Sequence, residues 1–191
     1  MEDITREQVG EAVNANTFEN VWAALGRLEK TVAETRADMA KTVADLSKNL
    51  GGLGNLQGRL TEAMFEPELC KKFYDIGFSF DSQIARKTFK ENGYSVAEAD
   101  FFLENGEYAM PVEVKTELSV GDVDEHIERI EKIRRYMDAR DDRRKLTGAI
   151  AGGIVSENVL RYAHKKGLYV LTQTGDSVAI RVPHNFKRHE W

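Results

Sequence analysis

The feature that most constrains this chain is an apolar heptad repeat near its N-terminus. Two interleaved rows of seven-residue spacing contain Phe18, Leu25, Val32, Met39, Leu46 and Leu53, then Val21, Leu28, Thr35, Thr42 and Asn49. Such rows are the two core positions of a coiled coil, in which polar core residues fix the register. We therefore expect residues 1–57 to form a long helix that pairs with the same helix of a second copy. The expected assembly is a homodimer, and a higher oligomer is the alternative. The alternative is a single amphipathic helix docked on its own domain.

Composition changes at Gly51-Gly52-Leu53-Gly54, which we interpret as the C-terminal stop of this helix. Residues 58–191 are then long enough for one ordinary domain. A chain with 41% hydrophobic and 31% charged residues is not disordered, and its single cysteine, Cys70, excludes an internal disulfide. Because no apolar stretch reaches the length of a membrane span and the first residues do not form a signal peptide, we expect a cytoplasmic protein.

From residue 58 the pattern predicts a mixed α/β domain. A helix is expected over 59–75, kinked or restarted at Pro67. The pairs Asn92-Gly93 and Asn105-Gly106 predict a three-stranded antiparallel meander over 83–91, 94–104 and 107–117, although the first of these segments also fits a helical face. A helix over 122–138, a buried strand over 148–155, a helix over 156–166 and a hairpin over 168–172 and 178–182 follow.

Acidic residues and one lysine are expected to converge on the meander. If Asn105-Gly106 forms a two-residue loop, Glu98 lies opposite Glu113 and Asp100 lies opposite Pro111. Since side chains alternate along a strand, one face then carries Glu98, Asp100, Glu113 and Lys115. Carboxylates gathered within a sheet raise each other's pKa and lose hydration. A divalent cation resolves this conflict, and oxygen ligands favour Mg²⁺ or Mn²⁺.

This segment resembles the PD-(D/E)XK nuclease superfamily. In that family an acidic residue on one strand precedes a (D/E)-X-K motif on the next, here Asp100 and Glu113-Val114-Lys115. The proline of the family name is replaced by Ala99. The resemblance covers about residues 58 to 183 and is strongest to a bacterial branch with a coiled-coil N-terminus. It implies an α/β restriction-endonuclease-like core, αβββαβ, with helices flanking a mixed sheet.

The resemblance also implies a role for each residue. Asp100 and Glu113 hold the metal, Val114 offers its backbone carbonyl to it, and Lys115 positions or deprotonates the attacking water. Glu62, on the first helix of the domain, matches a further glutamate that the family often adds, and Glu98 is expected to be another ligand or the neighbour of one. The implied activity is Mg²⁺- or Mn²⁺-dependent hydrolysis of phosphodiester bonds in nucleic acid. DNA is expected ahead of RNA, although these residues do not distinguish the two.

A basic run follows the charged helix and includes Arg134, Arg135, Arg143, Arg144 and Lys145. It predicts phosphate contacts beside the acidic site, or else it is the solvated end of a helix. The net charge of −5 restricts any nucleic-acid site to a local groove. The alternative function is a catalytically silent coiled-coil module whose nuclease-like domain binds a protein partner or nucleic acid.

Overall fold

The structure is a computed structural model that describes residues 6–67, 69–175 and 177–191, with side chains described from residue 18 onward. The chain divides into two compact units, one ending at Leu53 and the other running from Gly54 to Trp191. The first five residues of the segment predicted to be helical lie outside the described residues. No helix in the described residues is both long enough and apolar enough to cross a membrane.

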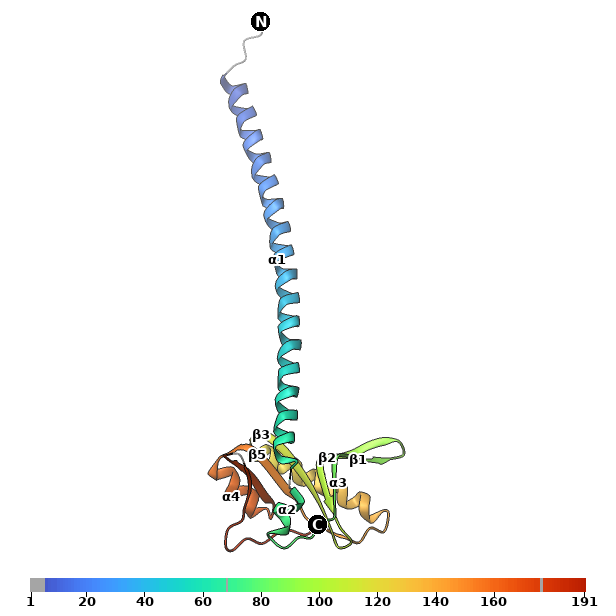
Figure 1. Cartoon of the computed structure of the whole chain (residues 1–191). Helices are drawn as coiled ribbons and strands as arrows, with labels where there is room; N and C mark the ends of the chain where they lie inside the picture. Colours follow the sequence, from blue (N-terminus) through green and yellow to red (C-terminus); the bar gives the residue numbers. More distant parts are fainter. Residues whose placement is uncertain (1–5, 68, 176) are drawn as a thin grey trace. The chain divides into compact units, whose positions relative to one another are not determined.

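Helix α1 runs without interruption from Arg6 to Phe65 (Figure 1). The predicted helix stop at residues 51–54 is therefore wrong. A glycine inside an exposed helix costs about 1 kcal/mol relative to alanine, but a helix that has already formed gains a backbone hydrogen bond with each added residue. The apolar rows also continue past the glycines, because Leu56 and Leu60 follow at the same spacing and are exposed like the earlier members.

The second unit is built on a mixed sheet, which in the described residues has seven strands. The strands are β1 (Ser82–Glu91), β2 (Tyr94–Glu104), β3 (Tyr108–Leu118), β4 (Lys145–Leu146), β5 (Ala149–Val155), β6 (Tyr169–Thr174) and β7 (Ser177–Arg181). Their order across the sheet is β1-β2-β3-β5-β6-β7, with β4 beside β3. The antiparallel meander β1-β2-β3 and the final hairpin are confirmed, and the strand reading of the first segment is correct. The short β4 was not predicted.

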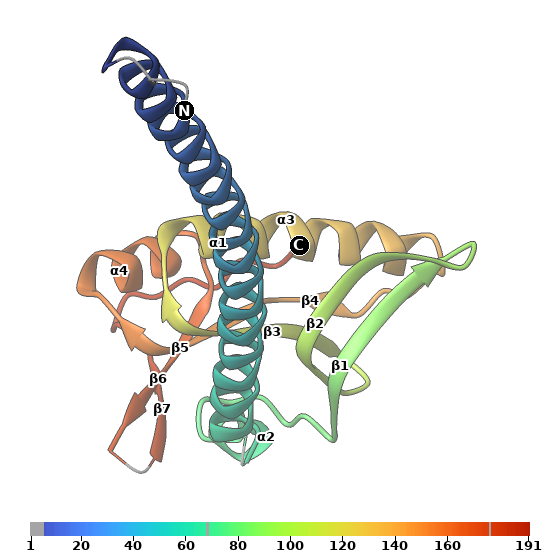
Figure 2. The same ribbon diagram turned by 90° about the horizontal axis from the view of Figure 1, so that it is seen from above.

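Helices cover both faces of this sheet (Figure 2). On one face lie α3 (Val120–Asp138) and α4 (Glu157–Lys165). Ser119 caps the first turn of α3 and Ser156 caps the first turn of α4, and serine is a favoured residue at this position. The buried residues of the two helices pack in one apolar core with Phe102 and Ile150. On the opposite face the last turn of α1 and helix α2 (Leu69–Tyr74) form a second core. The break between α1 and α2 spans Pro67, as predicted.

The two hairpins of the meander differ from each other. Asn92 and Gly93 have φ of 50° and 85°, so they form the predicted turn with both φ values positive. In the second hairpin the Asn105 side chain accepts the N–H groups of Glu107 and Tyr108, and the loop moves to Gly106-Glu107. Glu104 consequently lies opposite Ala109. The predicted pairing of β2 with β3 is thus wrong by two residues, but an even shift leaves every side chain on its predicted face.

Gly148 provides a test of this core. A Cβ at Gly148 would lie 2.4 Å from Ile130 Cδ1 and 2.7 Å from Leu168 Cδ2, both in side chains that are fully buried. We expect Gly148→Ala to lower the free energy of unfolding by about 1–3 kcal/mol, because the extra methyl overpacks the core. Urea unfolding followed by circular dichroism measures this change. Gly106→Ala is the control, since a methyl group there would have no atom within 4 Å and its φ is not positive; equal stability of both variants would contradict the packing described.

Candidate functional site

The candidate site lies where β2 and β3 separate. Their pairing ends at Phe101 opposite Val112, and beyond this point β2 pairs with β1 alone. Strands β1 and β2 leave the sheet as a two-stranded ribbon (Figure 2). In the gap, the Val114 N–H donates to Asp100 Oδ2 over 2.7 Å. A carboxylate thus takes the place of the backbone carbonyl that a continuous sheet would supply.

Three charged residues stand in one row across the sheet at this gap. The observed pairings place Arg86 of β1 level with Asp100 of β2, and extending the β2–β3 pairing places Glu113 of β3 level with both. Arg86 has a φ of 52°, a left-handed conformation that costs roughly 1–3 kcal/mol for a residue with a side chain. Its guanidinium lies 2.8 Å from Glu62 Oε2 on α1. Backbone strain of this kind concentrates at functional sites.

Glu113 is the buried centre of the site, with only 5% of its surface exposed. Its Oε1 lies 3.1 Å from Lys115 Nζ, and its Oε2 is bound by Arg129 of α3. Lys115 Nζ also lies 3.8 Å from Asp122 Oδ1. Sequence reasoning did not identify Arg129 or Asp122. Their seven-residue spacing places them on one face of α3. That this face belongs to the site can be recognised only from the packing of α3 against β3.

The ionisation of the site reflects this crowding. Burial, then the negative charge of Glu113, raise the pKa of Asp100 to about 6, although the hydrogen bond from Val114 opposes the change. Burial alone would lower the pKa of Lys115, but its hydrogen bond to Glu113 and the nearby negative charges raise it above the ordinary value. Lys115 is therefore a cation at neutral pH. In this state it can orient or stabilise an anion but cannot remove a proton.

The charges of the cluster nearly cancel. Its carboxylates are Glu62, Asp100, Glu113 and Asp122, and its cations are Arg86, Lys115 and Arg129. With all of them ionised, the carboxylates exceed the cations by one charge. A divalent cation would turn this excess into one positive charge, which matches the single negative charge of a phosphodiester.

The donor set suits a hard cation that keeps most of its own water. No three His, Cys, Asp or Glu side chains in the described part of the chain are placed to enclose a metal ion. Mg²⁺, however, is commonly held by one or two carboxylates with water completing an octahedron. Asp100 and Glu113 provide two such groups. Their partly desolvated negative charge, seen in the raised pKa of Asp100, is what a cation would relieve.

The other predicted ligands are placed differently. Glu98 is exposed and lies opposite Thr88 in the β1–β2 ribbon. Glu62 acts on Asp100 through its charge, but its carboxylate is bound to Arg86. Val114 contributes its N–H to Asp100. Metal ligation by Glu98, Glu62 and the Val114 carbonyl stays a prediction.

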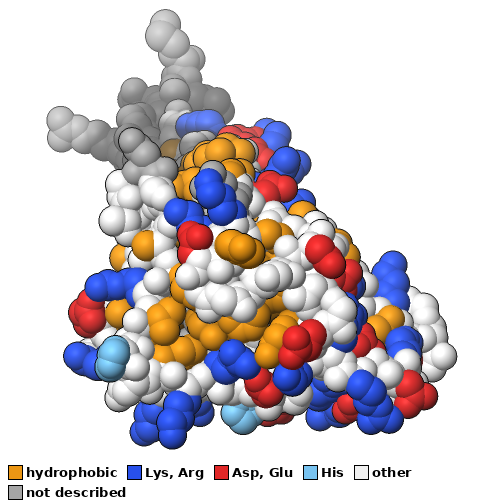
Figure 3. Space-filling view, turned by 60° about the horizontal axis from the view of Figure 1, so that its bottom comes forward, with side chains coloured by type: hydrophobic (Ala, Val, Ile, Leu, Met, Phe, Trp, Pro, Cys, Tyr) orange, Lys and Arg blue, Asp and Glu red, His pale blue; other side chains and the backbone are white. Residues whose placement is uncertain are grey.

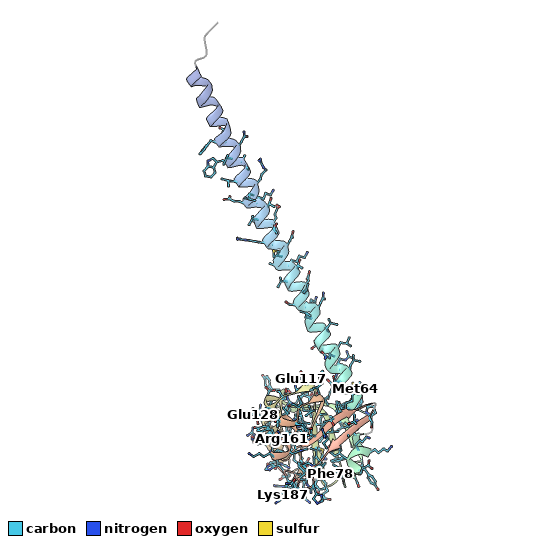
Figure 4. All side chains as sticks on the ribbon, turned by 90° about the vertical axis from the view of Figure 1, so that its left-hand side faces the viewer. Met64, Phe78, Glu117, Glu128, Arg161 and Lys187 are labelled. Atoms are coloured by element: carbon cyan, nitrogen blue, oxygen red, sulfur yellow. The ribbon has the colours of Figure 1, made fainter. Side chains whose placement is uncertain are left out.

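A pair of hydroxyl groups holds the end of α1 beside this region. Thr61 Oγ1 and Thr116 Oγ1 lie 3.0 Å apart, and Thr61 is buried. Figure 4 shows Met64 of α1 and Glu117 of β3 at the same end of the domain, opposite the end that carries Phe78 and Lys187. This contact fixes the end of α1, which carries Glu62, against β3.

His126 lies one turn before Arg129 on α3 and is completely buried. Neither of its ring nitrogens has a hydrogen-bond partner among the described residues. Burial, and then the positive charge of Arg129, lower the pKa of His126 to about 3. The imidazole is therefore neutral at physiological pH and adds no charge beneath the site.

The basic run expected to contact phosphates is largely engaged within the domain. Its ion pairs are Arg134 with Asp138, Arg143 with Asp141, Arg144 with Asp142 and Glu104, and Lys145 with Glu107. Arg135 is exposed on α3. On the face that Figure 3 presents, basic and acidic side chains are interspersed. Contact of this run with nucleic acid stays a prediction.

In the comparisons with known proteins, no family model and no curated protein matches the chain. Two solved structures resemble it in part. The small subunit of the heterodimeric restriction endonuclease R.BspD6I aligns with a TM-score of 0.33 and 15% identity, over 56% of this chain and 61% of that one. SfsA of Pyrococcus furiosus, solved with Ca²⁺, aligns with a TM-score of 0.30 and 18% identity, over 66% and 62%. The chain thus spans about three fifths of each, and likeness of this degree transfers no function.

Proposed function

We propose that this protein is a metal-dependent phosphodiesterase that hydrolyses nucleic acid, with DNA as the expected substrate. The observation that carries the proposal is the placement of Asp100 and Glu113 on the two sides of the β2–β3 gap, with Lys115 Nζ 3.1 Å from Glu113. This arrangement concentrates negative charge for a cation and positive charge for a phosphate in one place. Both are needed to stabilise the transition state of phosphodiester hydrolysis.

Each residue then has a defined task. Asp100 and Glu113 hold Mg²⁺ or Mn²⁺, which when bound supplies Lewis-acid polarisation of the phosphodiester and a water of lowered pKa. Lys115 remains protonated because of its raised pKa. It orients the attacking water and stabilises the negative charge that develops on the phosphate oxygens.

Metal binding and catalysis can be separated by mutation. Asp100→Asn and Glu113→Gln each remove a metal ligand, so calorimetry should show much weaker Mg²⁺ and Mn²⁺ binding together with lost cleavage. Lys115→Ala removes a positive charge beside the cation. Metal should then bind as well or better, while cleavage falls by about 100-fold or more. Cleavage is measured on single- and double-stranded DNA and RNA, with and without metal.

Matched controls exist on the same elements. Glu117→Gln changes an exposed glutamate on the same face of β3, and Lys132→Ala changes an exposed lysine on α3. Both should behave as the parent protein does. Metal binding that is absent in the parent, or unaffected by Glu113→Gln, would contradict the mechanism.

A second candidate function is favoured by one observation. Both Glu113 oxygens are already bound to cations of the protein itself, Lys115 and Arg129. A domain that binds nucleic acid or a protein partner without cutting needs no metal, and a site neutralised in this way is compatible with that role. Nucleic-acid binding that is independent of divalent cations, without cleavage, would identify this function.

The pH dependence of metal binding follows from the raised pKa of Asp100. A proton and a metal ion compete for the same carboxylate. Above the pKa of about 6 the carboxylate is ionised and affinity should be constant. Below it, affinity should fall by about tenfold per pH unit. An ordinary aspartate would not cause this loss until about pH 4, so calorimetric titrations across this range distinguish the two.

We also propose that α1 pairs with the α1 helix of a second copy. The apolar side chains along its heptad rows are exposed, among them Leu25 and Leu46 at 45% and 57%. Helices in water gain most of their stability from packing an apolar face rather than from propensity. The glycines inside α1 make that need larger. A coiled coil covers both rows with the same rows of its partner.

Charged residues placed in the apolar rows of α1 should separate the two copies. Leu25→Glu with Leu46→Glu buries like charges in one apolar row of the coiled coil, so we expect monomers at micromolar concentration where the parent is a dimer. Sedimentation equilibrium measures the mass. Lys30→Glu with Lys48→Glu, at exposed charged positions of the same helix, is the control. A monomeric parent would refute the proposed pairing.

A further inference from the structure

Arg129 binds the carboxylate that a metal ion would need. Glu113 is almost fully buried in the middle of β3, and Arg129 binds its Oε2 while Lys115 binds its Oε1. A carboxylate in this state has both oxygens directed at cations. A divalent ion that binds Glu113 therefore has to compete with these two cations for the carboxylate.

The two partners are not equally fixed. Lys115 belongs to the same strand as Glu113, two residues further on, and has a second acidic neighbour in Asp122. Arg129 comes from α3 across the layer, and Glu113 is the acidic partner that the described residues provide for it. Its side chain is 26% exposed and that of Lys115 is 35% exposed, so both reach solvent and only the second ion pair distinguishes them. Arg129 is thus the partner that can leave without abandoning a second ion pair.

The chemistry of a guanidinium gives the released side chain a destination. Arginine carries five N–H donors in a planar fork that matches two oxygens of a phosphate. Replacement of Arg129 on Glu113 by a divalent ion leaves this fork beside a site with excess positive charge. A phosphodiester that enters the site supplies a negative charge with which both the metal and the arginine can pair.

We propose that Arg129 is an exchangeable counter-ion: it holds Glu113 in the metal-free protein, and it transfers to a phosphate oxygen of the substrate when a divalent cation takes Glu113 Oε2. This inference rests on the proposed phosphodiesterase function. Through Arg129, helix α3 then couples the binding of the metal to the binding of the phosphate. Arg129 thereby favours the metal-free resting state in the absence of substrate and favours the loaded state in its presence.

The exchange predicts opposite effects of one mutation on two ligands. In Arg129→Gln the competitor of the metal is gone, so Mg²⁺ should bind about tenfold more tightly by calorimetry. Inorganic phosphate titrated into the Mg²⁺-saturated protein should bind about tenfold more weakly, because the fork is missing. Arg129→Lys should fall between the parent and Arg129→Gln for both ligands. Lys132→Gln, which removes an exposed positive charge from the same helix, should match the parent.

The parent protein offers a measurement that does not depend on the variant's folding. Side-chain ¹⁵N resonances of its arginines are recorded by NMR, and the Arg129 signal is identified by its absence in Arg129→Lys. It should shift when Mg²⁺ is added and shift again when phosphate follows. An Arg129 signal that stays in place while Mg²⁺ binds, or Mg²⁺ affinity that Arg129→Gln leaves equal or lowers, overturns the exchange and leaves the proposed function standing. Absence of Mg²⁺ and Mn²⁺ binding in both the parent and Arg129→Gln overturns the proposed function itself.

Discussion

The hydrogen bond from the Val114 N–H to the Asp100 carboxylate organises the candidate site of this molecule. A sheet that continued its backbone pairing here would have no use for a side-chain acceptor, and β2 would stay beside β3. Because the carboxylate satisfies the donor, the strands can part without leaving a buried N–H unpaired, which would cost about 1–3 kcal/mol. The gap then admits polar side chains to the middle of an apolar layer.

Once the gap exists, its charges must be neutralised locally. Glu113 has little contact with water, and a buried carboxylate without partners would be strongly unfavourable. The protein supplies Glu113 with one cation from the same strand and one from α3. Asp100 keeps a raised pKa, and the cluster as a whole keeps one more negative charge than positive charges. Apolar residues of similar size would form a more stable sheet at this position. The proposed function gives a reason for charge to be held here against that preference.

Local signals account for what could be predicted from the sequence. The serine that caps α4, the proline before α2 and the Asn92-Gly93 turn act over a few residues, and each produced the expected structure. The second turn did not, because Asn105 uses its side chain to accept two backbone N–H groups and so chooses a different loop. The predicted face for Asp100, Glu113 and Lys115 survived only because strand alternation is insensitive to an even shift.

Features that depend on contacts between distant parts of the chain could not be predicted, because the usable signals in the sequence are local. Glycines at 51–54 signal a helix end in a short segment, whereas here they lie inside sixty residues of continuous helix. The pairing of Arg129 with Glu113 depends on how α3 packs across the sheet, a relation between elements that no spacing along the chain records. The sequence could therefore identify the acidic and basic residues of β2 and β3 but not the cation that faces them.

The left-handed conformation of Arg86 has a consequence for how copies of the protein meet. Strand β1 is an edge of the sheet, and an edge presents unpaired backbone groups that can recruit a strand from another molecule. Arg86 breaks the regular run of these groups, and the irregularity between Phe89 and Lys90 breaks it again. Charged side chains along the strand add to the obstruction. The edge nearest the site is thereby guarded against aggregation through β-strand addition.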